Sequence, residues 1–168
     1  MSGTSLFARA RATGRLWNSA LVVIDVAVVA GATVAAYIAR FEGPVPEPFA
    51  RWMGPFIGLA AAAYVGLFAA FGLYRLLLRY VGVDTLLRLT GAVAAGAVVL
   101  FALDLVLPGT EGMRPVPLGV LFIQAVLVFL GSAASRLAAR VLLYVRALGA
   151  AQGRRVLVIG AGSAGSLL

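Results

Sequence analysis

The chain is 168 residues long, 62% hydrophobic and 12% charged, with a mean hydropathy of +1.04. Ordinary soluble domains carry about 25% charged residues, so this chain has too little polar surface to cover a globule in water. The net charge is +8, and every basic residue is an arginine beside or within an apolar run, a pattern that indicates membrane topology rather than nucleic-acid binding. The sequence has no cysteine and no histidine, so we assign no disulfide and no metal site.

The first segment, residues 1–15, is basic and contains no acid, like the start of a signal peptide. The apolar run that follows, about residues 16–39, is longer than the roughly 7–15 apolar residues of a signal peptide. It also carries Asp25. We therefore interpret it as a retained membrane span that follows a cytoplasmic N-terminus.

Three more apolar runs follow, at about residues 55–74, 89–107 and 116–134. Residues 40–48 contain three prolines and a glycine, which end the first span. Residues 75–88 alternate arginine with leucine and valine, which is typical of a helix lying in the headgroup layer. Nothing breaks the last helix before about residue 148, so we expect it to continue into the cytosol. Residues 16–148 are thus predicted to form a four-helix transmembrane bundle.

Small residues recur every four positions in two of these runs. Gly58, Ala62, Gly66 and Ala70 form one such stripe, and the third run pairs Gly91 with Ala95 and Ala92 with Gly96. Such stripes let helices approach closely, within one chain or in a homo-oligomer, although an alanine-rich span also produces them by chance.

The arginines are distributed unequally between the predicted loops. With the N-terminus inside the cell, the inner segments hold most of them, and the two outer loops hold few arginines and also contain acids. This bias predicts a multi-pass protein of a bacterial inner membrane with both termini in the cytoplasm. The inner set is Arg9, Arg11, Arg15, Arg75, Arg79, Arg88, Arg136, Arg140, Arg146, Arg154 and Arg155, and the outer set is Arg40, Arg51 and Arg114. Aromatic residues near the predicted span ends, namely Trp17, Tyr37, Trp52, Tyr74 and Tyr144, are interpreted as interfacial anchors.

Polar side chains within the spans are the candidate intramembrane site. Asp25 lies roughly 13 Å into the first span at about 1.5 Å per residue, where an unpaired carboxylate costs at least about 2.5–3.5 kcal/mol. It is either an ion, proton or lipid-linked-substrate site, or a helix–helix hydrogen bond to Thr33, Gln124, Thr90 or a backbone carbonyl. Asp104 lies near the outer end of the third span, within reach of the interface. A transporter would need more converging polar groups than Asp25, Asp104 and Gln124.

The last segment, residues 149–168, begins a different kind of structure. A short apolar run, Val156–Ile159, leads into G-x-G-x-x-G at Gly160, Gly162 and Gly165, which is the opening of a Rossmann-like nucleotide-binding unit. The first glycine permits the tight turn, the second lets a pyrophosphate approach, and the third allows helix–sheet packing. The alternative is a turn that keeps its glycines for packing and binds nothing.

Taken in order, these pieces resemble the N-terminal part of the membrane-bound nucleotide-sugar 4,6-dehydratases of bacterial polysaccharide biosynthesis, the capsule-type epimerase/dehydratase family. The matching residues are Ile24-Asp25, 37–43 (Tyr-Ile-Ala-Arg-Phe-Glu-Gly), 72–75 (Gly-Leu-Tyr-Arg), Arg79-Tyr80, 135–137 (Ser-Arg-Leu) and 155–165. The resemblance implies four spans, an accessory Rossmann-like domain and then a catalytic domain that uses NAD(P) on a nucleotide sugar. The glycine motif matches the accessory domain, so no catalytic residue is expected within residues 1–168.

Two alternatives stay open from the sequence. The larger polyprenyl-phosphate sugar-1-phosphate transferases also place four spans and a Rossmann-like domain ahead of a catalytic region. A membrane module that only anchors or assembles other components would need no catalytic region at all.

Overall fold

The computed structural model describes residues 3–74, 82–107 and 114–150. Four helices make up almost all of this part: α1 (Gly3–Phe41), α2 (Glu47–Ala70), α3 (Val83–Val106) and α4 (Leu118–Ala150). Each contains a stretch long and apolar enough to cross a membrane, at Ser19–Phe41, Phe49–Ala70, Val83–Val106 and Leu118–Arg146. The prediction of four apolar helices, each long enough to span a membrane, is therefore confirmed. The predicted strand Val156–Ile159 and the glycine turn after it lie outside the described residues.

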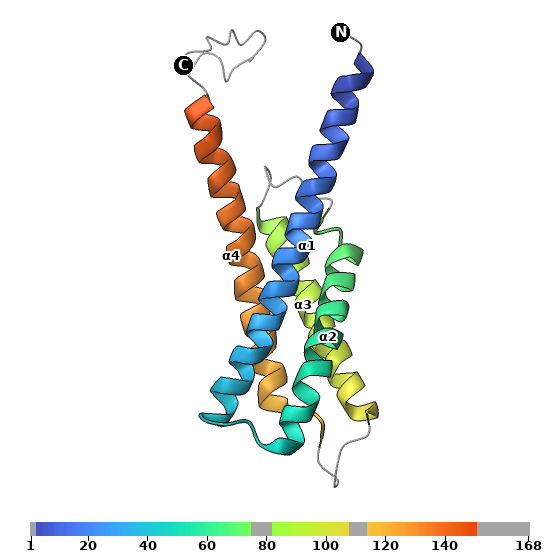
Figure 1. Cartoon of the computed structure of the whole chain (residues 1–168), viewed down its shortest axis with the longest axis vertical. Coiled ribbons are helices and arrows are strands. Elements are labelled where there is room, and N and C mark those ends of the chain that lie inside the picture. Colours follow the sequence, from blue (N-terminus) through green and yellow to red (C-terminus); the bar gives the residue numbers. More distant parts are fainter. Residues whose placement is uncertain (1–2, 75–81, 108–113, 151–168) are drawn as a thin grey trace.

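The helices are arranged as an up-and-down bundle. α1 packs against α2 and α4, and α3 packs against the same two helices, so α4 closes the bundle onto α1. Figure 1 shows that α1 begins and α4 ends at the same end of the bundle, and that both project beyond α2 and α3 there. We call this the terminal end. The opposite end, where the chain passes from α1 to α2, is called the loop end.

Local chemistry explains where α1 and α2 end. α1 stops at Phe41 because Glu42 adopts a left-handed conformation, with φ at 50°, and Gly43 and Pro44 follow it. α2 stops after Ala70, where Gly72 takes the left-handed conformation, with φ at +73°, and donates its N–H to the Ala69 carbonyl at 3.0 Å.

The helices differ in length from the predicted spans. α2 begins at Glu47, ahead of the predicted start, and contains Pro55 within the helix. α3 begins at Val83, within the segment that was predicted to lie in the headgroup layer. Residues 75–81 of that segment lie outside the described residues. α4 runs unbroken to Ala150, as the missing helix breaker in the sequence indicates.

The two small-residue stripes have different surroundings. α2 buries a stripe of Phe56, Ala60, Tyr64 and Phe68 in the bundle. The Gly58 stripe lies on the exposed side of α2, with nothing within 4 Å of a methyl group added at Gly58 or Gly66. The expected close approach of a neighbouring helix to this stripe is therefore not found within the described chain.

The stripe on α3 does pack closely. Ala92 and Gly96 are buried, and the ring of Tyr64 fills the space where a side chain at Gly96 would lie. A ring of Phe71 lies 3.0 Å from a methyl group added at Gly91. Glycines on α3 thus let the aromatic residues of the α2 segment approach the α3 backbone.

Candidate functional site

Asp25 lies on α1 inside the bundle, toward the terminal end, and only 1% of its surface is exposed. Its neighbours come from two other parts of the chain: Tyr74 follows the end of α2, and Ser132 and Arg136 lie one turn apart on α4. These four residues are called the Asp25 cluster. Arg136, which the sequence assigns to an inner segment, is 3% exposed, so its side chain lies inside the bundle.

Both carboxylate oxygens of Asp25 accept hydrogen bonds from the other members of the cluster. Arg136 donates from Nη1 to Oδ1 and from Nη2 to Oδ2, each at 3.0 Å, which is the bidentate arrangement that a guanidinium favours. The Tyr74 hydroxyl donates to Oδ2 at 2.9 Å, and the Ser132 hydroxyl donates to Oδ1 at 3.3 Å. Each oxygen therefore accepts two hydrogen bonds, and none of these partners is among those proposed from the sequence.

Arg136 has two further contacts that hold it in place. Its Nη1 also donates to the Ser132 backbone carbonyl at 3.0 Å, across one turn of α4. Its guanidinium carbon lies 5.3 Å from the centre of the Phe68 ring on α2, within the range of a cation–π contact. Arg136 thus joins α4 to both α1 and α2.

Tyr74 contributes a hydrogen-bond donor that stays protonated. Burial raises the pKa of the Tyr74 hydroxyl, and the charge of Asp25 together with the hydrogen bond to it raises this pKa further, against the opposing effect of Arg136. The phenol is therefore neutral throughout the physiological range and can donate to the carboxylate. The hydroxyl of Tyr74, a predicted interfacial anchor, is thus directed to the Asp25 carboxylate.

The energetics of the cluster follow from its surroundings. Single charges within a span are costly, and a buried pair becomes tolerable only when geometry is good and the remaining polar atoms have partners. The Asp25 cluster meets this condition, since the ion pair is bidentate and two hydroxyl groups also donate to the carboxylate. Such a pair resists separation strongly, because removal of either partner leaves the other buried and uncompensated.

A second polar contact lies farther toward the loop end of the α1–α4 interface. Gln124 donates from Nε2 to the Thr33 hydroxyl at 2.7 Å, and that hydroxyl donates to the Val29 carbonyl at 2.8 Å. Thr33 and Gln124 have no exposed surface. This contact joins two residues that the sequence singled out, although the sequence interpretation offered both as partners for Asp25.

Asp104 lies near the loop end of α3, and its side chain is buried in the bundle, with 3% of its surface exposed. Its Oδ1 accepts the backbone N–H of Val116 at 2.9 Å, just before α4 begins, so it ties the end of α3 to the start of α4. Tyr37 is fully buried in the same half of the bundle, which corrects its assignment as an interfacial anchor.

Apolar side chains separate these polar groups. Val29 and Val128 lie between the Asp25 cluster and the Thr33–Gln124 contact along α1 and α4, and both are fully buried. In the described part of the chain, no three acidic side chains gather into a set that could hold a metal ion. The geometry therefore fits interhelical fastening better than a continuous path for ions or protons.

The cofactor-binding candidates Gly160, Gly162 and Gly165 lie outside the described residues. Comparison with known proteins finds no matching family model, curated protein or solved structure.

The sequence contains a signal that could have identified Arg136 as the main partner of Asp25. Asp25 lies several turns into the first span, and Arg136 comes about two residues after the apolar part of the last one. An arginine side chain is long enough to extend from a span end toward a buried carboxylate. A lone intramembrane acid should therefore be compared with arginines that flank other spans. Tyr74 and Ser132 carried no comparable signal.

Proposed function

We propose that this chain is the membrane-anchoring part of a bacterial polysaccharide-biosynthesis enzyme, and that it holds the polypeptide following α4 at the cytoplasmic face of the inner membrane. The observation that carries the anchoring role is the Asp25 cluster. It fastens α1 to α4 at the end of the bundle from which both helices project (Figure 1). A helix tied in this way keeps a fixed position and rotation relative to α1.

The orientation is supported by the arginine distribution. Apart from Arg136, which the cluster buries, the arginines of the terminal end belong to segments predicted to face the cytoplasm. A reporter fused after Gly149 tests this orientation. A cytoplasm-only reporter is expected to be active and a periplasm-only alkaline phosphatase inactive, and the reverse pattern would contradict the proposed orientation.

The enzymatic part of the proposal is supported by the sequence resemblance. The nucleotide-sugar dehydratases that the chain resembles would use NAD(P) bound in a catalytic domain, with Gly160, Gly162 and Gly165 opening an accessory Rossmann-like domain. The intact protein should convert a nucleoside-diphosphate hexose to a product lighter by one water, as measured by mass spectrometry. A product that partitions into organic solvent with a polyprenyl phosphate would instead favour the sugar-1-phosphate transferase alternative.

A non-catalytic anchoring module is the second candidate, and one observation favours it. Every contact of the Asp25 cluster is made within the bundle, so its geometry is fully explained by anchoring. Absence of both products from the intact protein, with the bundle still folded in the membrane, would support this candidate.

A further inference from the structure

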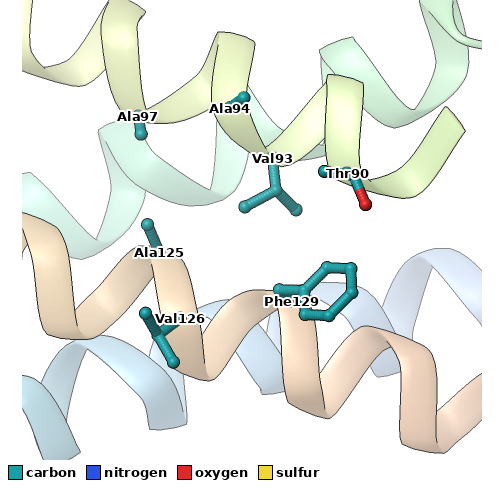
Figure 2. A pocket seen from close by; sticks show the side chains of 7 residues that line it. All are labelled: Thr90, Val93, Ala94, Ala97, Ala125, Val126 and Phe129. Atoms are coloured by element: carbon teal, nitrogen blue, oxygen red, sulfur yellow. The ribbon is translucent and has the colours of Figure 1, made fainter. Parts of the chain in front are cut away.

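An open apolar groove of about 270 Å³ lies between α3 and α4. Figure 2 shows its two walls, with Ala97 of α3 opposite Ala125 of α4 at one end, and Val93 and Thr90 of α3 opposite Phe129 of α4 at the other. The alanines make the groove, because their short side chains leave space that larger residues would fill. Thr90 is the one polar residue in the lining, and its hydroxyl already donates to the Leu86 carbonyl at 2.9 Å. The groove therefore offers contacts to hydrocarbon and none to a polar ligand.

The groove lies near the centre of the bilayer. Leu118 marks the loop end of the span on α4, and Phe129 comes about 16 Å along the helix at about 1.5 Å per residue. The hydrocarbon core is about 30 Å thick, so Phe129 lies near its midplane. Arg140 is the same distance beyond Phe129 and thus lies near the headgroups on the terminal side.

The two ends of the groove differ in the residues that follow them on α3 and α4. Phe101 of α3 and Phe122 of α4 come one turn beyond the groove toward the loop end, on the same helix faces, and both are exposed. The small residues that leave the groove open are thus followed on both helices by large aromatic residues. Toward the terminal end, the same face of α4 leads to the exposed side chain of Arg140, three helical turns from Phe129.

We propose that the groove holds the hydrocarbon chain of an anionic phospholipid from the terminal-side leaflet, with the phosphate at the level of Arg140. The chain supplies the apolar contacts that the groove requires, and the distance from Phe129 to Arg140 matches the depth of one leaflet. Arg140 supplies the charge complementarity, and one arginine near the surface favours an anionic headgroup by about fivefold. This inference depends on the membrane-spanning bundle and not on the enzymatic proposal.

The test uses spin-labelled lipids in phosphatidylcholine vesicles that contain the purified protein. Phosphatidylglycerol with a nitroxide near the end of its acyl chain is expected to show an immobilised component about fivefold stronger than phosphatidylcholine with the same label. Ala94→Leu and Ala97→Leu should abolish that component by filling the groove. Arg140→Gln should remove the preference for phosphatidylglycerol while retaining chain immobilisation.

Matched controls separate this binding from general lipid contact. Ala102→Leu adds the same side chain at an exposed position on α3 outside the groove, and Arg146→Gln removes an exposed arginine farther along α4. Both should behave like the wild type. Equal immobilisation in the groove variants and the wild type would overturn the proposal. So would a shift of the monomer–dimer equilibrium on groove filling, since this outcome would identify a second copy of the chain as the occupant.

Discussion

At the scale of single residues, the main feature is the buried ion pair of Asp25 and Arg136, which joins α1 to α4. Asp25→Ala should lower the free energy of unfolding by about 3–5 kcal/mol, because Arg136 then remains buried without its counter-ion. Denaturation in mixed micelles measures this change. Arg136→Lys should also destabilise, because an ammonium group cannot reproduce the bidentate contact.

The exposed pair of Arg88 and Asp84 provides a matched control, with N–O separation 2.8 Å and side chains 47% and 69% exposed. Arg88→Gln should change stability by less than about 1 kcal/mol. Equal effects at the two pairs would show that burial does not strengthen the Asp25 cluster.

Tyr74 gives a second residue-scale prediction. Tyr74→Phe keeps the ring and removes a hydrogen bond to a charged group, so it should cost about 1.5–3 kcal/mol at neutral pH. Thermal unfolding in detergent measures the difference.

The same residue predicts a pH dependence with a definite sign. The folded protein raises the pKa of Tyr74 above its ordinary value of 10.0. The stabilising contribution of Tyr74 is therefore complete below about pH 10 and is lost as the pH rises above that value, since the unfolded state then gives up the proton first. Wild-type stability should fall more steeply above pH 10 than that of Tyr74→Phe. Parallel curves would contradict the role of the phenol as a buried donor.

At the scale of the helices, the stripes of small residues give a sharp comparison. Gly96→Ala forces a methyl group into the Tyr64 ring and should destabilise the bundle by about 1–3 kcal/mol. Gly66→Ala adds a methyl group where nothing lies within 4 Å, and should be neutral or stabilising by about 0.5–1 kcal/mol through helix propensity. The pair of variants can be compared in one denaturation series. Loss of self-association in Gly66→Ala alone would indicate that the exposed stripe contacts a second copy.

The existence of the four helices was predictable, because long apolar runs and proline-rich breaks are strong local signals. The polar partners were less predictable. Arg136 follows an apolar run and carries a charge, so sequence alone placed its side chain in the cytosol. Its actual position depends on the packing of α1 against α4, which no local pattern encodes. For the same reason, the repeat of small residues did not reveal which stripe faces the bundle.

At the scale of the whole molecule, the central claim is that α1 and α4 are packed side by side and fastened at the terminal end. The sequence has no cysteine, so introduced pairs can be cross-linked without background. A methyl group added at Gly131 of α4 would lie 2.7 Å from Cγ1 of Val28 of α1. These two positions are therefore close enough for introduced cysteines to form a disulfide.

Oxidative cross-linking of Val28→Cys with Gly131→Cys in native membranes is the most direct test of the account. The packing of α1 against α4 predicts rapid formation of a disulfide within one chain, and slower formation when Asp25→Asn is added. Val23→Cys with Gly131→Cys, in which the first position faces outward at 67% exposure, should not cross-link within the chain. Cross-linking only between chains, or equal rates for the two pairs, would contradict the packing of α1 against α4.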